Sequence, residues 1–307
     1  MVNGSRIERI LAPNPSPMTL EGTNTYLVYG AREAIAIDPG PLDEEHTLRI
    51  VAAATRRGAT IAAIAVTHGH PDHAPGAASL HARTGAPVYA HRAANFPVDV
   101  RVGEGDRVAL RDTALDVLDA PGHAVDHLVF SDLEEAALFT GDVVIGRGTI
   151  VIAPPSGDMR AYQRTLARLQ RDYGAARTIY GGHGEKVSAP REKLDEYIAH
   201  RHQREREILA ALGDEERTIP ELVADVYRNV ATSLWPAAAR QVLAYLIALE
   251  REGRVVARTL ERAPTRAEAD ILNPDLSRIV DTASAAVAAA ELGIDRALST
   301  LETYRRA

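Results

Sequence analysis

The stretch AVTHGHPDHAPG, residues 65–76, places three histidines and an aspartate within a few positions of one another. It overlaps the end of an apolar run, IAAIAVTH (61–68), which predicts a buried strand. The carboxyl ends of strands in α/β sheets are where ligand sites usually lie. Imidazole and carboxylate groups suit zinc and the neighbouring divalent metals. Because such groups crowded together would lose hydration without a cation among them, the cluster predicts a metal site.

The spacing inside this cluster indicates two ions rather than one. Alternation along an extended loop projects His68 and His70 to the same side, whereas Asp72 and His73 lie beyond Pro71 and can serve a second ion. Two ions need more ligands, and other apolar runs end in candidates beside glycines, which let the backbone approach a ligand closely. The candidate ligands from all four strand ends are His68, His70, Asp72, His73, His123, Asp142 and His183.

The order of the apolar runs predicts the architecture of residues 1–190. Short strand-like runs alternate with helical patterns, and several strand-like runs follow one another in the middle, which favours two sheets packed inside outer helices. Helices are expected at 44–58, 78–85 and 159–174. Strands are expected at 25–30, 33–40, 61–68, 87–91, 107–110, 113–121, 127–132, 136–142 and 177–183.

Beyond residue 190 the pattern becomes helical. Helices are expected at 191–212, 218–230 and 235–253, followed by a short strand pair at 254–262, and this order is typical of a winged helix. From Ala263 onward an apolar stripe at helical spacing, running from Leu276 to Leu301, predicts a helical tail. The stripe needs a partner, which is either the same chain, a second copy in a homodimer, or a substrate beneath a lid. The expected domains are residues 1–190, 191–262 and 263–307.

Composition narrows the class of protein. The net charge is −7 and no segment is basic, which speaks against a nucleic-acid partner. No apolar run is long enough to span a membrane, and MVNGSRIERI does not resemble a secretory signal, so we expect a cytoplasmic protein. The sequence has no cysteine, which excludes thiolate ligands, cysteine nucleophiles and disulfides.

Several motifs together resemble the metallo-β-lactamase superfamily. In chain order they are THGHPDH (67–73), PGH (121–123), TGD (140–142) and GGHG (181–184), and PSPMTLEGTNTYLVYG (15–30) is similar to that superfamily's opening strands. The resemblance covers residues 5–190 and implies an αββα sandwich with the site at the shared edge of its sheets. It also implies the ligand sets, which are His68, His70 and His123 for a first ion, and Asp72, His73 and His183 for a second, with Asp142 bridging them.

Asp142 and the lack of cysteine make the chain resemble the glyoxalase-II-type hydrolases more than the zinc β-lactamases. WPAAARQVLAYLIALEREGRV (235–255) is similar to a winged-helix extension found on a branch that includes β-lactamase-like endoribonucleases. The expected fold class is therefore α/β, with an αββα metallo-β-lactamase sandwich, a mainly helical winged-helix domain and a helical C-terminal tail.

The expected function is hydrolysis by a hydroxide shared between two divalent ions, zinc first, with iron and manganese as alternatives. Asp72 is the candidate for orienting that hydroxide and accepting its proton. A small-molecule thioester, ester or lactone is the favoured substrate, and single-stranded RNA, cut by an endoribonuclease, is the alternative. The candidate recognition helix carries Arg240, Gln241 and Arg251 beside acidic residues, which suits packing against protein better than gripping phosphates.

Other residues carry weaker hypotheses. His127 either orients a ligand or has a structural role, and Arg147 and Arg160 are candidates for contact with an anionic substrate. The residues expected to serve the fold or to face solvent are Tyr26, Asp38, His46, His81, His91, His200 and His202.

Overall fold

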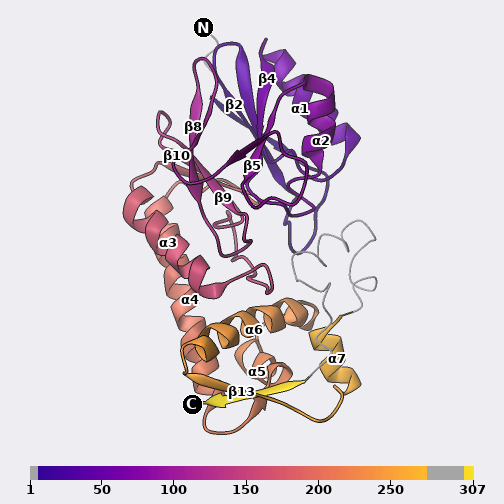
Figure 1. Ribbon diagram of the computed structural model, residues 1–307, viewed down its shortest axis with the longest axis vertical. Helices are drawn as coiled ribbons and strands as arrows, with labels where there is room; N and C mark the ends of the chain where they lie inside the picture. The colour runs from indigo at the N-terminus through magenta and orange to yellow at the C-terminus, as the bar shows by residue number, and fades with distance from the viewer. Residues whose placement is uncertain (1–5, 275–300) are drawn as a thin grey trace.

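The computed structural model describes residues 6–274 and 301–307, and two sheets form its N-terminal part (Figure 1). The first sheet consists of β1 (Ile7–Leu11), β2 (Asn24–Tyr29), β3 (Glu33–Ile37), β4 (Thr60–Ala65), β5 (Val88–His91) and β6 (Val100–Val102), in that order. The second, in the order β11-β10-β9-β8-β7, consists of β7 (Arg107–Ala109), β8 (Ala114–Asp119), β9 (Leu128–Asp132), β10 (Ala137–Gly141) and β11 (Thr178–Gly181). The expected strand ranges contain neither β1 nor β6.

Helices cover the outer faces of both sheets. The helices α1 (Glu44–Arg56) and α2 (Gly76–Thr84) pack on the first sheet, and α3 (Met159–Tyr173) packs on the second. A separate apolar core lies between the sheets, and Ile35 and Phe130 are both fully buried in it. The αββα sandwich that the sequence predicts is confirmed.

The first turns of α1 and α3 are fixed by aspartates at their N-termini. Asp43 accepts a hydrogen bond from the backbone N–H of His46, and Asp158 accepts one from that of Ala161. Such caps satisfy backbone donors that have no partner inside the helix. They therefore define where the covering helices begin relative to the strand-end loops.

The C-terminal part is a winged-helix domain, which the long helix α4 (Pro190–Leu212) connects to the sandwich (Figure 1). Its other helices are α5 (Ile219–Val226), the short 3₁₀ helix η1 (Thr232–Leu234), α6 (Trp235–Arg251) and α7 (Arg266–Leu272). Its sheet has the order β12-β14-β13, with β12 (Arg217–Thr218), β13 (Val255–Thr259) and β14 (Glu302–Arg306).

The end of the chain corrects two expectations. The strand pair expected at 254–262 is wrong, because only β13 forms there and its partner is β14, which lies between β12 and β13. The helical tail is wrong for residues 302–306, where Thr303 and Tyr304, residue types that favour strands, are buried. The rest of the predicted stripe, from Leu276 to Leu298, lies outside the described residues, whereas Leu301 is buried in the core.

The winged-helix domain is packed firmly against the sandwich. One continuous apolar core runs from Leu118 and Ile179 in the sandwich to Leu246 and Tyr304 in the winged-helix domain. Arg160 of α3 forms ion pairs across this boundary with carboxylates of the second domain. The two parts therefore form one body with a shared interior. In residues 6–274 and 301–307, none of the helices has the length and apolar character that crossing a membrane requires.

Candidate metal centre

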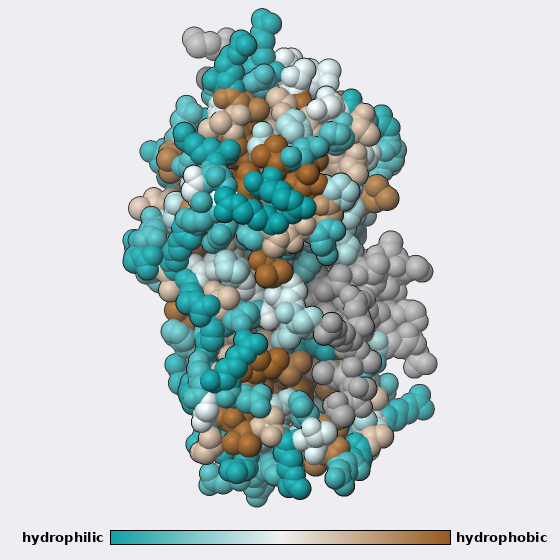
Figure 2. Space-filling model, viewed as in Figure 1, coloured by the Kyte–Doolittle hydropathy of each residue, from teal (hydrophilic) through white to brown (hydrophobic). Residues whose placement is uncertain are grey.

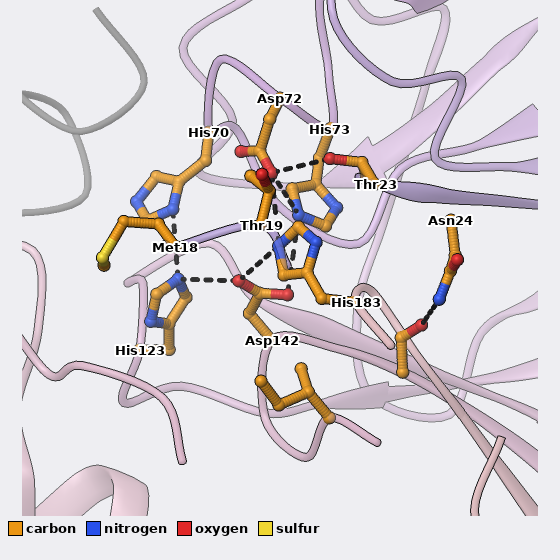
Figure 3. Close-up of polar contacts among 12 residues, drawn as sticks. Met18, Thr19, Thr23, Asn24, His70, Asp72, His73, His123, Asp142 and His183 are labelled. Carbon is orange, nitrogen blue, oxygen red and sulfur yellow. Dashed lines mark hydrogen bonds and ion pairs between the residues drawn. The ribbon is translucent and has the colours of Figure 1, made fainter. Parts of the chain in front are cut away.

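All seven predicted ligands meet at the strand ends of the sandwich. The loop after β4 carries His68, His70, Asp72 and His73, and the other candidates follow three strands of the second sheet, namely His123 after β8, Asp142 after β10 and His183 after β11. In Figure 3 the side chains from the first loop face those from the second sheet across a small central space. The two sheets thus supply opposite walls of one cluster.

The ligand atoms fall into three groups in which every pair lies within 4.8 Å. His68, His70 and His123 form the first group, which has the members of the first set implied by the family resemblance. The second group contains Asp72, His73 and His183, the members of the other set. A third group joins Asp142 to His68 and His73, one from each set, so Asp142 lies where a shared ligand would be needed.

Within the part of the chain that the structure describes, several buried nitrogen and oxygen atoms of the cluster have no hydrogen-bond partner and are of the kinds that bind metal ions. Each of the following buried atoms has no hydrogen-bond partner among the described residues: His68 Nε2, Asp72 Oδ1, His73 Nε2, Asp142 Oδ1 and His183 Nε2. Buried polar groups are normally hydrogen-bonded, so a set of unpaired atoms at one point calls for an explanation. Imidazole nitrogens and carboxylate oxygens are ligands for divalent transition metals. The residues present therefore fit metal ions.

Hydrogen bonds behind the cluster fix which imidazole nitrogen faces inward. His123 Nδ1 donates to the carbonyl oxygen of Val151 at 3.0 Å, and His183 Nδ1 donates to that of Gly22 at 3.3 Å. Each bond leaves Nε2 as the nitrogen that points into the cluster, and in the neutral imidazole this nitrogen carries no proton and can bind a metal. Thr23 Oγ1 donates to Asp72 Oδ2 at 2.9 Å and holds that carboxylate in place.

Asp38 is the centre of this supporting layer. Its Oδ2 accepts from His73 Nδ1 at 2.9 Å and from Thr67 Oγ1 at 2.7 Å, and its Oδ1 accepts from the Thr67 backbone N–H at 2.7 Å. Thr67 Oγ1 in turn lies 3.0 Å from His68 Nδ1. We expected Asp38 to serve the fold, but it directly orients one candidate ligand and, through Thr67, a second.

His127 also lies in the supporting layer. Its Nε2 accepts a hydrogen bond from the backbone N–H of Asp142 at 3.1 Å, and its ring stacks on that of His68 with centroids 4.6 Å apart. Of the two roles considered for His127, the contacts favour orientation of the cluster. Tyr26 donates to the carbonyl oxygen of Gly181 at 2.8 Å and thereby ties β2 to β11, which is a structural role.

In the cluster without metal, the histidines of the first group (His68, His70 and His123) differ in protonation from those of the second (His73 and His183). Burial lowers the pKa of His68 and His123, and it lowers that of His70 to about 3. Burial opposes the charged form of His183 as well, but Asp142 and Asp72 outweigh it and raise the pKa of His183 to about 10. Asp72 also outweighs burial at His73, whose pKa lies well above its usual value.

The pKa values of the cluster's two carboxyl groups, Asp72 and Asp142, are lowered. Burial alone would raise the pKa of Asp72, but the neighbouring His73 holds it well below the usual range. For Asp142, burial is similarly outweighed, mainly by His183, and the pKa is again lowered. Both carboxylates are therefore ionised at neutral pH, which is the form that binds metal ions.

A cavity of about 300 Å³ opens beside the cluster, with His123 in its wall. On the sandwich side it is lined by residues of the loops 17–20 and 145–151, including Met18 and Ile145. On the opposite side it is lined by residues of α4 and of the segment from Tyr227 to Gln241. The winged-helix domain thus forms half of the cavity.

The cavity bears on the roles expected for three residues, and Arg160 is not among those that line it. Arg147 lines the cavity, as its candidate role requires, and pairs with Glu21 on the surface. His200, expected to be structural or exposed, lines it as well. The hypothesis that Arg160 contacts substrate is wrong, because its guanidinium is held by Glu205 and Glu252. The residues His81 and His202 are exposed, His46 is buried in α1 and His91 is half-buried, as suits structural or solvent-facing positions.

Fold and site together define a class in which an αββα sandwich carries a histidine- and aspartate-rich cluster at its strand ends. A family model described as metallo-beta-lactamase superfamily matches residues 18–97 and 92–183, and one described as beta-lactamase associated winged helix domain matches residues 218–261. The chain belongs to the metallo-beta-lactamase superfamily, a family of hydrolases, and carries this associated domain.

Individual relatives extend the similarity over most of the chain. The chain is 33% identical to "Beta-lactamase-like protein 2 homolog" of Drosophila melanogaster over 82% of this chain and 90% of that protein. It is 34% identical to an "Atrochrysone carboxyl ACP thioesterase" of Aspergillus chevalieri over 73% of this chain and 74% of that protein. The crystal structure of a metallo-beta-lactamase family protein from Thermus thermophilus has the same fold, with a TM-score of 0.70 over 82% of this chain and 96% of that one, at 23% identity.

Proposed function

We propose that this protein is a metal-dependent hydrolase of small-molecule thioesters, with esters and lactones as the related alternatives. His68, His70 and His123 would hold one divalent ion and Asp72, His73 and His183 a second, with Asp142 shared between them. Such ions lower the pKa of water towards neutrality and polarise a carbonyl oxygen. A similarity to a protein named as an acyl-carrier-protein thioesterase supports the thioester.

The carrying observation is the position of the cavity, which has His123 in its wall and room for a small acyl group. A ligand site is typically a concave, mostly apolar space with a few polar groups placed to orient the ligand. Here the apolar part comes from side chains such as Leu20, Ile145 and Leu234, and the reactive end lies at the candidate ligands. An acyl chain in this cavity would place its carbonyl carbon beside the cluster.

Asp72 would handle the proton of the attacking water. Its Oδ2 is held by Thr23 Oγ1, whereas its Oδ1 is buried and free of hydrogen bonds. An ionised carboxylate with one free oxygen can orient a water molecule and accept its proton. Thr23 would thereby position Asp72, because its hydroxyl fixes the rotation of the carboxylate.

In α6, the candidate recognition helix for RNA, two of the three candidate polar side chains are turned inward and the third forms an ion pair. Arg240 and Gln241 are buried, with 2% and 5% of their surface exposed, and Arg251 is paired with Asp158 of the sandwich. On the face of the molecule seen in Figure 2, apolar side chains lie over α6. Because RNA binding needs basic side chains that reach phosphates, these contacts favour the thioester over the endoribonuclease.

The test is a parallel assay of the metal-loaded protein on a panel of acyl thioesters and lactones and on a labelled single-stranded RNA. We expect thioester hydrolysis that Asp142→Ala abolishes, with the RNA left intact. Asp172→Ala, which removes an exposed carboxylate of α3, is the matched control and should retain the activity. RNA cleavage that depends on Asp142, without acyl hydrolysis, would refute the proposal.

A further inference from the structure

The cavity beside the cluster contains a buried positive charge that no carboxylate of the described residues neutralises. Arg201 of α4 has 1% of its surface exposed and lines the cavity. Its Nη1 donates to Gln241 Oε1 at 3.1 Å and its Nη2 to the carbonyl oxygen of Ile150 at 2.6 Å. Its guanidinium lies 5.0 Å from the centre of the Tyr162 ring. All of these partners are uncharged.

Burying an ion without a counter-ion is costly, and proteins normally pair such groups. The other arginines that line the cavity do have carboxylate partners, since Arg147 pairs with Glu21 at the surface and Arg204 with Glu207. Arg201 has no ion pair within residues 6–274 and 301–307, and the residues known to line the cavity include neither aspartate nor glutamate. The cavity wall therefore lacks one negative charge.

Unused hydrogen-bond donors point to the same conclusion independently. Arg201 Nε and Gln241 Nε2 are both buried and have no hydrogen-bond partner among the described residues. Both residues line the cavity, and they already contact each other. A guanidinium beside an amide N–H matches the two oxygens of a carboxylate, which arginine binds more specifically than a point charge does.

The chain also places this pair close to the metal cluster. Ile150 gives its carbonyl oxygen to Arg201, and the next residue, Val151, gives its carbonyl oxygen to the candidate ligand His123. Neighbouring Cα atoms are about 3.8 Å apart, so the two anchoring points are a short distance from each other. A short acyl chain can therefore extend from the cluster to the guanidinium.

We propose that Arg201 and Gln241 bind a carboxylate at the far end of the substrate's acyl group, so that the favoured substrates are thioesters of short dicarboxylic acids. This inference rests on the proposed function, which it narrows to an anionic acyl group. Arg201 supplies the charge, and Gln241 both orients it and donates its free amide N–H. In the proposed complex the bound carboxylate is the counter-ion that Arg201 otherwise lacks.

The first test compares two thioesters of N-acetylcysteamine with acyl groups of equal length, adipoyl with a terminal carboxylate and hexanoyl without one. We expect kcat/KM for the adipoyl thioester to exceed that for the hexanoyl thioester by about tenfold or more, the effect of one charged hydrogen bond. Measuring kcat/KM for the shorter succinyl and glutaryl thioesters as well would show which acyl chain length is preferred. Equal kcat/KM values for charged and neutral acyl groups at every length would overturn the proposal.

Gln241→Glu is the decisive variant because it preserves the shape of the side chain. The new carboxylate would lie where Gln241 Oε1 lies, 3.1 Å from Arg201 Nη1, and would neutralise the guanidinium from within the protein. We expect the preference for the adipoyl thioester to disappear and the melting temperature to rise. A preference that survives in Gln241→Glu would overturn the proposal. Arg228→Gln, an exposed arginine outside the cavity, is the control and should keep the preference.

A binding measurement separates this proposal from the proposed function. Adipate and hexanoate share one carboxylate that can contact the cluster, and they differ only in the second carboxylate. Calorimetry on the metal-loaded protein should give tighter binding of adipate in the wild type and equal binding in Gln241→Glu. If neither thioester is hydrolysed, the proposed function fails, and this titration still decides the carboxylate site. Equal affinities in the wild type would overturn it.

Discussion

The metal cluster and the wall of the cavity beside it both contain buried charged side chains, but the partners of these charges differ. In the cluster, Asp72 and Asp142 lie within ion-pair distance of His73 and His183, with nitrogen–oxygen distances of 3.2–3.5 Å. In the cavity, the partners of Arg201 in the described part of the chain are all uncharged. The cluster is also held by a supporting layer within the sandwich, whereas the cavity wall depends on how the second domain docks. This difference fits the two proposals, a resident metal centre in the cluster and an exchangeable substrate carboxylate in the cavity.

Among the tests of this comparison, removing divalent ions with a chelator should change activity and stability the most. Hydrolysis should be lost. The melting temperature should fall as well, because a ligand whose free concentration is 1,000 times its Kd stabilises the native state by about 4 kcal/mol. Activity assays and thermal denaturation before and after dialysis against chelator measure both effects. Restored activity and stability on adding zinc would show that the loss is specific, and full activity in protein shown to be metal-free would contradict the cluster's assignment.

Asp38→Asn tests the supporting layer. It removes the charge behind His73 and Thr67, and loss of such an orienting partner typically lowers metal affinity by about 10–100-fold. Titration with a competing metal chelator would measure the change. Asp172→Asn, on the surface of α3, serves as the control and should have wild-type affinity. Wild-type affinity in Asp38→Asn as well would show that the layer only supports the fold.

Proton release should distinguish the two halves of the cluster. In the metal-free protein, His73 and His183 have raised pKa values, the latter about 10, so both are protonated at pH 7. His68, His70 and His123 have lowered pKa values and are neutral there. Metal binds only neutral imidazole, so binding of an ion by the half of the cluster that contains Asp72 releases protons and becomes tighter as the pH rises. Binding of an ion by the other half releases few protons.

Calorimetry of zinc binding at pH 7 in buffers of different ionisation enthalpy measures this release. We expect one binding step whose enthalpy depends strongly on the buffer and another whose enthalpy hardly does. His183→Ala should remove much of the buffer dependence. Two steps with the same dependence would show that the halves do not differ in protonation.

The smallest effect concerns docking of the second domain. Arg160→Gln breaks ion pairs with Glu205 and Glu252 at a partly exposed boundary, where such pairs contribute little. We expect the free energy of unfolding to fall by about 1 kcal/mol or less, with the substrate preference unchanged. Chemical denaturation measures the former and the adipoyl-to-hexanoyl ratio the latter. A large change in that ratio would mean that cavity geometry depends on these surface pairs.

The sequence predicted the cluster better than the cavity for a physical reason. His68, His70, Asp72 and His73 are adjacent, so their unusual density is visible in one short stretch. Asp38 follows a strand just as Asp142 does, but it lies near the opening strands of the chain and was expected to serve the fold.

No local pattern reveals the cavity. Arg201 and Gln241 belong to two helices that are far apart in sequence, and each resembles an ordinary polar residue of an amphipathic helix. Only tertiary packing brings them to one wall. The same holds for β14, whose partners β12 and β13 are separated from it by long stretches of chain, so hydrophobic periodicity could not indicate the pairing.

The position of β14 in its sheet has a consequence for biosynthesis. Thr218 in β12 pairs with Thr303 in β14, and among the described residues β14 is the strand that pairs with β13. The helices of the second domain emerge from the ribosome first, but their sheet cannot close until residues 302–306 are free. During that interval apolar residues that Tyr304 and Leu301 later help to cover are exposed. Until residues 302–306 have been made, the second domain of the nascent chain therefore remains open to chaperones and to aggregation.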